Sequence, residues 1–239
     1  MTGRAIAIDG PAASGKSTTA HAVADRLGFA HLNSGRLYRA IGWLADLQDR
    51  APGDSDFEAW VEGLHIGLRG EPPDLVVTID GATPGTALDE PEVAVAASVV
   101  ARNAAVRGRV LEILRGASAQ YDIVCDGRDI GTSVFPEAPL KVFLVASAAE
   151  RARRRLLDQG EEPTRERLEG ASARLRQRDL ADETRELSPL RRASDAIEID
   201  TTTMPADEVV DQIVELAAER GIAGAGADRE GGKPPDFVS

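Results

Sequence analysis

Near its N-terminus the chain carries the pattern G-x-x-x-x-G-K-[ST], written Gly-Pro-Ala-Ala-Ser-Gly-Lys-Ser at residues 10–17. A short apolar run at residues 5–8 precedes it and is typical of a buried strand. The stretch 17–27 predicts a helix with Gly28 at its C-cap. A strand, a glycine-rich loop and a helix in this order aim backbone N–H groups and the positive end of the helix at one point. The segment therefore predicts a strand–loop–helix unit that can hold a phosphate chain.

Lys16 decides between that interpretation and an ordinary strand-to-helix turn. The chain has three lysines, at positions 16, 141 and 233, and uses arginine for its other strong bases. One of the three stands where a compact, mobile ammonium must reach two phosphates. Ser17 adds a hydroxyl for Mg²⁺, which prefers oxygen ligands. The predicted ATP site consists of Gly10, Pro11, Ala12, Ala13, Ser14, Gly15, Lys16, Ser17 and Thr18.

Composition limits the class of protein. A chain of 239 residues can bury the core of one α/β domain with an insertion or two, and aromatic residues make up only 4% of it. The formal net charge of -12 disfavours nucleic acid or an anionic membrane as a partner. In so acidic a chain, positive charge that binds phosphate must be gathered locally, so clustered arginines are informative.

Redox and targeting signals favour the cytoplasm. Cys125 is the single cysteine, which excludes an internal disulfide and fits a reducing compartment. The apolar run at 5–8 is too short for a signal peptide or a spanning helix, because Asp9 follows it at once. We expect a cytoplasmic monomer whose partners are small-molecule nucleotides rather than nucleic acid or membrane.

The rest of the chain predicts alternating strands and helices with one antiparallel insertion. Strand candidates at 29–32, 123–125, 142–145 and 196–199 are separated by loops and helical segments, which is typical of a parallel sheet. The strand candidates 64–69 and 75–80 have no helix between them and predict an antiparallel pair. In the first half of the chain we also expect a helix from about 34 capped by Asn33 or Ser34, a polar loop at 51–62, and a helical stretch from Pro91 to about 120 that is broken near 102–103. In the second half we expect an arginine-dense helical region at 149–179 that is broken at 160–163 and a closing helix at 204–220. A disordered tail is expected from 221.

Charged residues follow a predicted buried strand at Asp126-Gly127-Arg128-Asp129. In open α/β sheets the carboxyl ends of the strands border the ligand crevice. Asp126 is the candidate to act on Mg²⁺ through water, together with Ser17. The alternative is a turn with surface charges, which we consider weaker because Gly-Arg-Asp directly after a buried strand suits a ligand better than solvent.

The arginines at 149–185 allow two interpretations. Acids are interspersed among them, so solvated salt bridges are the default for most. A phosphoryl-transfer site, however, needs cations on a segment that can close and exclude water, and the break at 160–163 could act as its hinge. We expect some of these arginines to be structural and some to touch phosphate. The three histidines, His21, His31 and His65, lack metal-ligand spacing and are assigned core or surface roles.

Four blocks of sequence resemble bacterial cytidylate kinases over roughly residues 4–220. The loop block is shared by many families, whereas the second and third blocks are narrow signals. The blocks are Ile8-Asp9-Gly10-Pro11 with Gly15-Lys16-Ser17-Thr18; Asn33-Ser34-Gly35 with Tyr38-Arg39; Asp126-Gly127-Arg128-Asp129-Ile130-Gly131-Thr132 with Phe135-Pro136; and Arg178-Asp179 with Asp182, Arg185 and Pro189-Leu190.

The resemblance implies an α/β fold of the P-loop NTPase type, with a five-stranded parallel sheet core, an antiparallel monophosphate-binding insertion and a short helical lid. It also implies Mg²⁺-assisted transfer of the ATP γ-phosphoryl group to CMP or dCMP. The corresponding division of the chain is a core at 1–62, 89–148 and 186–220, an insertion at 63–88, a lid region at 149–185 and a tail at 221–239.

The resemblance further implies a set of site residues. Ser98, Arg107 and Asp129 would face the cytosine, whose N4 amino group donates and whose N3 and O2 accept. The acceptor phosphate, the sugar and the lid side of the site would be served by Ser34, Arg39, Arg128, Arg178, Asp182 and Arg185. The candidate catalytic residues are Lys16, Arg128, Arg178 and Arg185. Arg178 and Asp182 are spaced i,i+4 and would pair if the helix persists that far.

Two departures from the family and two other functions complete the expectations. The family often has Asp at Asn33, and Gly or Ala at Ala13 and Ser14; neither change removes a charge that the phosphate site needs. A kinase of the same fold for UMP, AMP or a sugar stays open, although converging arginines argue against a neutral sugar. A guanine-specific switch is disfavoured, because Asn33 and Asn103 are the only asparagines and neither precedes Lys.

Overall fold

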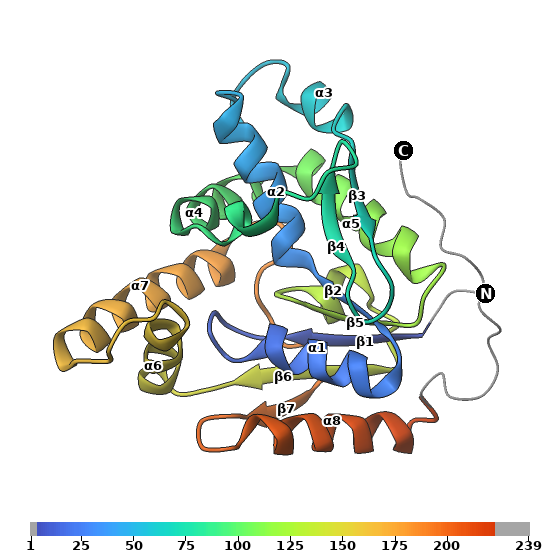
Figure 1. Cartoon of the computed structure of the whole chain (residues 1–239), viewed down its shortest axis with the longest axis vertical. Coiled ribbons are helices and arrows are strands. Elements are labelled where there is room, and N and C mark those ends of the chain that lie inside the picture. Colours follow the sequence, from blue (N-terminus) through green and yellow to red (C-terminus); the bar gives the residue numbers. More distant parts are fainter. Residues whose placement is uncertain (1–3, 223–239) are drawn as a thin grey trace.

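A parallel sheet of five strands runs through the middle of the protein, whose computed structural model describes residues 4–222 (Figure 1). The strand order is β2-β5-β1-β6-β7, and every neighbouring pair is parallel. This confirms the predicted fold class. The strands are β1 (Ala5–Asp9), β2 (Ala30–Asn33), β5 (Ile123–Gly127), β6 (Leu140–Val145) and β7 (Ile197–Asp200).

The register of the sheet brings the polar strand ends to one edge. β1 and β5 are buried along their whole lengths, which explains their continuous apolar runs. At their carboxyl ends Asp9 lies opposite Gly127, and Asn33 of β2 lies opposite Asp126. Three polar side chains far apart in sequence therefore emerge together.

Helices cover both faces of the sheet. α1 (Lys16–Leu27) and α8 (Ala206–Glu219) pack on one face in a core that includes Val23 and Ile213. α2 (Ser34–Leu47) and α5 (Ala104–Ser118) pack on the other, in a core that includes Ile41. Gly28 ends α1 in the left-handed conformation, and its N–H bonds to carbonyls of the last turn, as the sequence predicts.

α4 (Pro91–Val100) crosses α2 at very close range. A Cβ on Gly42 would lie 2.7 Å from the backbone nitrogen of Ala97, so only glycine allows this approach. The predicted break near 102–103 is confirmed, because α5 starts at Ala104 with Asn103 as its N-cap. A 3₁₀ turn, η1 (Gly85–Asp89), leads into α4.

The predicted antiparallel pair is present as β3 (Ile66–Arg69) and β4 (Val76–Ile79). The expectation of a polar loop at 51–62 is wrong for its second half, which forms α3 (Phe57–Glu62). Phe57 and Val61 lie four residues apart and are both fully buried, so packing stabilises a short helix that its polar composition disguised.

The arginine-dense region forms α6 (Ala148–Asp158) and α7 (Arg165–Thr184), with the predicted break between them. The two helices project to one side of the sheet in Figure 1 and enclose a small apolar cluster that includes Ala12 of the glycine-rich loop. A π-helical turn, η2 (Ile130–Val134), follows β5. Of the predicted tail at 221–239, residues 223–239 lie outside the described part of the chain. No helix between residues 4 and 222 is long and apolar enough to cross a membrane.

Candidate functional site

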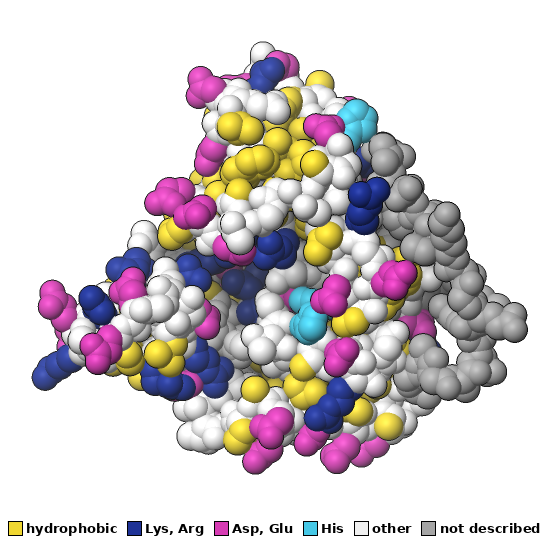
Figure 2. Space-filling model, in the orientation of Figure 1, with side chains coloured by type: hydrophobic (Ala, Val, Ile, Leu, Met, Phe, Trp, Pro, Cys, Tyr) yellow, Lys and Arg dark blue, Asp and Glu magenta, His cyan; other side chains and the backbone are white. Residues whose placement is uncertain are grey.

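A cavity opens between the glycine-rich loop, α2, α4 and α7, and basic side chains gather in it (Figure 2). It is lined by every predicted site residue except Gly10, Pro11 and Arg107. The motifs and the resemblance suggested these residues from stretches far apart in the chain, and the fold brings them to one place. Their roles are taken up under the proposed function.

The loop is held in a conformation that most residues avoid. Gly10 has φ of 151°, and a Cβ there would lie 2.2 Å from the carbonyl oxygen of Leu144. Ala13 also has a positive φ, of 58°, which is uncommon for a residue with a side chain. This backbone opens into a concave turn immediately before α1, the arrangement that suits an anion.

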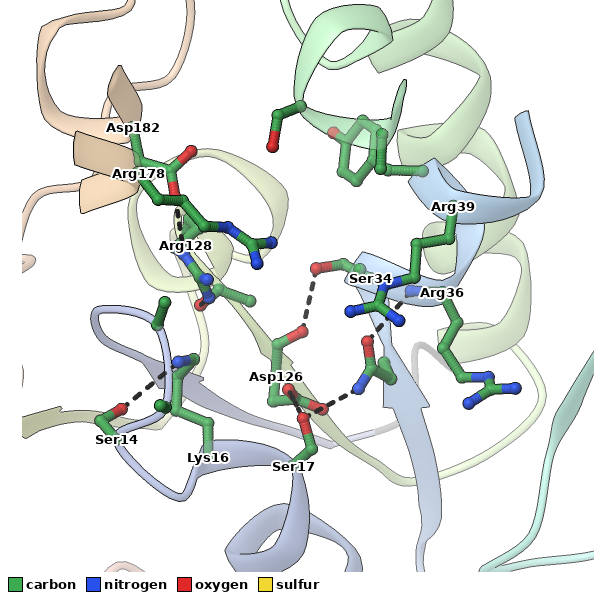
Figure 3. Close-up of a pocket in the computed structure, with 18 of the residues that line it drawn as sticks. Ser14, Lys16, Ser17, Ser34, Arg36, Arg39, Asp126, Arg128, Arg178 and Asp182 are labelled. Atoms are coloured by element: carbon green, nitrogen blue, oxygen red, sulfur yellow. Dashed lines mark hydrogen bonds and ion pairs between the residues drawn. The ribbon is translucent and has the colours of Figure 1, made fainter. Parts of the chain in front are cut away.

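Lys16 lies buried at the floor of the cavity. Its Nζ donates to the carbonyl of Pro11 and to Ser14 Oγ at 3.3 Å (Figure 3). Desolvation is the main cause that lowers the pKa of Lys16 well below its ordinary value, and the neighbouring charge of Arg128 adds to it. An anion in the cavity would supply the counter-charge that this ammonium lacks.

Ser17 and Asp126 form an oxygen-rich pair beside the loop. Ser17 Oγ donates to Asp126 Oδ2 at 2.7 Å, and Asn33 Nδ2 donates to Ser17 Oγ at 2.9 Å. A hydroxyl and a carboxylate fit Mg²⁺, which is usually held by one or two protein oxygens together with phosphates and water. Between residues 4 and 222 no cluster of three or more His, Cys, Asp or Glu side chains suits a metal, so nucleotide and water would have to complete such a shell.

His31 belongs to this group, contrary to the core or surface role expected from the sequence. Its Nε2 lies 2.8 Å from Asp126 Oδ1, the carboxylate oxygen that Ser17 does not use. Histidine spacing along the chain gave no signal for this contact, because it depends on the pairing of β2 with β5.

Asp182 pairs with Arg128 rather than with Arg178, so the predicted i,i+4 pair is wrong. Arg128 Nε donates to Asp182 Oδ2 at 2.9 Å, whereas the guanidinium of Arg178 extends into the cavity (Figure 3). Within the described residues, the buried Nε of Arg178 has no hydrogen-bond partner. Desolvation, followed by the charge of Arg128, lowers the pKa of Arg178 to about 10. A guanidinium whose buried Nε lacks a partner, beside another cation, is typical of an anion site.

Arg39 faces Arg178 from the other wall of the cavity (Figure 3). Its Nη1 donates to the carbonyl of Leu88 at 2.7 Å, which leaves other donors of the guanidinium for a ligand. Burial lowers the pKa of Arg39, while Asp89 opposes that shift. Arg36 points away and donates to Asp89 at 3.0 Å.

Asp129 is held between two arginines at the far end of the cavity. Arg107 Nη2 donates to its Oδ2 and Arg185 Nη2 to its Oδ1 at 3.3 Å. Arg107 lies behind the lining, with its guanidinium carbon 5.7 Å from the centre of the Tyr38 ring. Burial raises the pKa of Tyr38 to about 12. The result is a buried polar pocket with one carboxylate and two flanking cations.

The two candidate caps of α2 have different partners. Asn33 is the N-cap, because its Oδ1 accepts from the N–H of Arg36 at 3.1 Å. Ser34 is not, since its Oγ donates to the carbonyl of Asp126 at 2.9 Å. Ser98 Oγ donates within α4 to the carbonyl of Ala94 at 3.2 Å and lines the cavity.

Several lining residues were not chosen from the sequence. Tyr38 stood in the block that carries Arg39, so that block held a signal for it. Arg155 was one of many arginines on α6, and only the fold distinguishes it from Arg153, which pairs with Glu150. The other lining residues missed are Asn33, Gly35, Arg36, Asp89, Pro91, Ala97, Ala101, Gly127, Asp158, Gln159, Glu161 and Leu175.

Comparison with known proteins matches one family along most of the chain. The family described as cytidylate kinase matches residues 6–219. Cytidylate kinase of Lactobacillus gasseri is 38% identical over 90% of this chain and 94% of its own length. That of Geobacillus sp. is 39% identical over 90% and 96%.

Bifunctional proteins match as well. The bifunctional pantoate ligase/cytidylate kinase of Parasynechococcus marenigrum is 43% identical over 88% of this chain but only 42% of its own length. The chain therefore spans about two fifths of such relatives. Among solved structures, shikimate kinase from Acinetobacter baumannii aligns with 91% of the chain at 15% identity and a TM-score of 0.46.

Proposed function

Because the chain belongs to the cytidylate kinase family, we propose that it transfers the γ-phosphoryl group of ATP to CMP or dCMP, giving ADP and CDP or dCDP. The observation that carries the proposal is the guanidinium of Arg178, which extends into the cavity that Lys16 lines and whose buried Nε has no hydrogen-bond partner among the described residues. Cations on both sides of one cavity suit two nucleotides that meet phosphate to phosphate.

The donor half of the site consists of the glycine-rich loop and the start of α1. Backbone N–H groups of residues 13–18 and the ammonium of Lys16 bind the β- and γ-phosphates of ATP. Burial disfavours the charged form of Lys16, and a bound anion would stabilise that charged form again. The loop residues Gly10, Pro11 and Ala12 give the turn its shape.

Ser17 and Asp126 would hold Mg²⁺, Ser17 directly and Asp126 through water. The chemistry supplied by such an ion would be neutralisation of the negative charge that develops during transfer. Asn33 donates to Ser17 Oγ, and His31 Nε2 lies within hydrogen-bond distance of Asp126 Oδ1, so these side chains orient Ser17 and Asp126.

The acceptor half consists of arginines from three elements. Arg39, Arg128 and Arg178 hold the phosphate of CMP, and Arg185 and Asp182 serve the sugar and the lid side. These cations also stabilise charge on the transferred phosphoryl group, together with Lys16. No covalent intermediate is required, because in-line transfer needs positioning and electrostatics.

The Asp129 pocket fits a cytosine. Its carboxylate can accept from the N4 amino group and Ser98 can donate to N3 or O2, while Arg107, behind the lining, holds the carboxylate in place. Uracil has a carbonyl in place of that amino group and would face a carboxylate, which is unfavourable. This contrast favours CMP over UMP as the acceptor.

We assign the parts of the chain accordingly. Residues 1–62, 89–148 and 186–220 are assigned to the core, which carries the ATP loop and also Arg39, Ser98 and Asp129 of the acceptor side. Residues 63–88 are assigned to the monophosphate-binding insertion, although none of them lines this cavity, and residues 149–185 to the lid. α6 and α7 bring Arg155 and Arg178 to the cavity, so closure of this segment would add cations and exclude water.

An assay of ADP release with ATP, Mg²⁺ and a panel of CMP, dCMP, UMP and AMP tests the proposal. We expect CMP and dCMP to be phosphorylated efficiently, UMP weakly and AMP hardly at all, with loss of activity in EDTA. ADP release that does not depend on any monophosphate would favour a nucleotide-dependent switch, and a preference for UMP or AMP would overturn the assignment of the Asp129 pocket.

A further inference from the structure

A buried ion pair joins the lid helices to the glycine-rich loop. Asp179 of α7 and Arg151 of α6 have side chains only 9% and 10% exposed, and Arg151 Nη1 donates to Asp179 Oδ2. Four other arginines of these helices pair with nearby glutamates, as Arg153 does with Glu150. The Asp179–Arg151 pair differs because its remaining polar atoms reach the loop.

Both backbone groups of Ala12 are bound by this pair. Asp179 Oδ1 accepts from the N–H of Ala12 at 3.0 Å, and Arg151 Nη1 donates to the carbonyl of Ala12 at 3.1 Å. Arg151 Nε also donates to the carbonyl of Ala146, at the carboxyl end of β6, at 3.2 Å. The contacts therefore connect the two peptide groups that flank Ala12 to α6, α7 and the sheet.

The position of Ala12 makes this connection important for a ligand. Ala13, which follows it, has the positive φ of 58° that turns the loop toward the cavity. A non-glycine residue keeps such a conformation only where its surroundings enforce it. The bond to Asp179 also directs the N–H of Ala12 toward α7, so the phosphates must be bound by the N–H groups that follow.

Stability alone is a weak reason for such a pair. Two charges lose their hydration when they are buried, and well-packed apolar residues can stabilise a core as well or better. Apolar residues, however, cannot accept a hydrogen bond from one backbone group and donate a hydrogen bond to another. Only polar side chains can hold the loop backbone in one orientation in this way.

We propose that Asp179 and Arg151 are positioning residues for the donor nucleotide, which hold Ala12 by its N–H and carbonyl and thereby keep the loop in its phosphate-binding shape before ATP arrives. This inference depends on the proposed function only for the identity of the donor. The pair touches no substrate, so its effect passes through the loop backbone.

ATP binding without CMP is the measurement that tests the proposal. We expect Asp179→Ala to raise the Kd of Mg-ATP about tenfold, the effect of one lost buried hydrogen bond, and to raise KM for ATP similarly. The Kd of CMP should stay within about twofold, because Arg128 and Asp182 hold the acceptor side of α7 independently. Asp179→Asn keeps an oxygen that can accept from Ala12 and should recover most of the ATP affinity.

The control is Asp122→Ala, which removes another buried aspartate paired with an arginine. Asp122 accepts from Arg4 at the opposite end of β5, far from the loop in sequence and structure. We expect this variant to lower the melting temperature without changing the ATP to CMP affinity ratio.

Two results would overturn the proposal. One is an unchanged Kd of Mg-ATP in Asp179→Ala with a lower melting temperature, which would mean a structural role only. The other is an equal loss of ATP and CMP affinity. If Asp179→Ala does not fold, Arg151→Met is measured instead, and it too must weaken ATP more than CMP. A wild-type chain that binds ATP but does not phosphorylate CMP would refute the proposed function and leave this test intact.

Discussion

Lys16 lies buried among two arginines and two carboxylates. Arg128 and Arg178 lower the pKa of its ammonium, while Asp126 and Asp9 raise it, and desolvation outweighs them all. The charge is therefore costly in the empty cavity and is best explained by the anion that it would bind.

Replacing Lys16 by Ala should remove a cation that acts mainly on the transferred phosphoryl group. We expect kcat/KM to fall roughly 10²- to 10³-fold, which corresponds to about 3–4 kcal/mol of lost transition-state stabilisation. The fold should stay intact. Steady-state kinetics and far-UV circular dichroism check both parts.

Lys141→Ala is the matched control for Lys16→Ala. Lys141 is the other lysine within residues 4–222 and is buried too, but it donates to Asp195 at 2.8 Å and to the carbonyl of Pro136. Its loss should reduce stability and leave kcat nearly unchanged. Near-normal turnover of Lys16→Ala would contradict the role given to Lys16.

Asp129 tests the acceptor half of the site. Asp129→Ala should raise the Kd of CMP far more than the Kd of ATP, because the proposed partner of the cytosine amino group is lost and Arg107 and Arg185 lose the carboxylate that they share. Calorimetric titration of each nucleotide separately measures the two effects, with Asp122→Ala as the comparison. Equal damage to both nucleotides would indicate that Asp129 supports the whole site instead.

At the scale of elements, the crossing of α2 and α4 brings together two walls of the cavity, on the side proposed for CMP. α2 carries Arg39 and α4 carries Ser98, and Gly42 lets the two helices approach. A methyl group there would meet backbone atoms, which cannot yield as a flexible side chain could.

Gly42→Ala should therefore separate the two helices. We expect a loss of about 1–3 kcal/mol in the free energy of unfolding, the cost of overpacking, together with a raised KM for CMP. Chemical denaturation and steady-state kinetics measure these. Gly116→Ala in α5 is the control, because a Cβ there meets nothing within 4 Å. It should gain up to about 1 kcal/mol from helix propensity and leave KM unchanged. A Gly42→Ala protein as stable as wild type would contradict the packing argument.

At the scale of the whole molecule, the protonation state of the Asp9 carboxyl group, in the middle of the sheet, affects the stability of the fold. Its Oδ1 and Oδ2 accept from the N–H groups of Ile130 and Gly131 at 2.8 and 2.7 Å, which ties β1 to the turn after β5. Desolvation raises the pKa of Asp9 from 3.8 to about 6, against the effect of these two bonds, and the charge of Asp129 adds to the rise.

Between these two pKa values the folded protein binds more protons at Asp9 than the unfolded chain does. The contribution of Asp9 to stability is thus complete below about pH 4 and is lost as the pH rises through about 6. The rise of the pKa from 3.8 to about 6 corresponds to about 3 kcal/mol in the free energy of unfolding. Urea denaturation should show wild type losing about that much relative to Asp9→Asn between pH 4 and 7, and a pH-independent difference between the two proteins would contradict it.

The helices and strands could be predicted largely from local sequence. The loop, its strand and its helix are neighbours in the chain, and a continuous apolar run or a capping residue acts over a few positions, as with Gly28 and Asn33. α3 was missed because two buried residues, Phe57 and Val61, stabilise it through tertiary packing rather than through propensity.

The gathering of site residues at one sheet edge could also be foreseen. Parallel strands end on the same side, so Asp126 and Arg128 had to emerge near the glycine-rich loop. The sequence by itself thus determined the fold class, the phosphate-binding loop and, through the order of its blocks, the family.

Only the tertiary structure decided which charged group meets which. Arg128 binds Asp182, Asp126 meets His31, and Asp179 reaches Ala12 across 167 positions of sequence. The physical reason is range: periodicity and capping act within a few residues, whereas an ion pair forms between whichever groups packing brings together. Among the many arginines of this acidic chain, only the fold separates those that line the cavity, such as Arg178, from those that lie at the surface, such as Arg153.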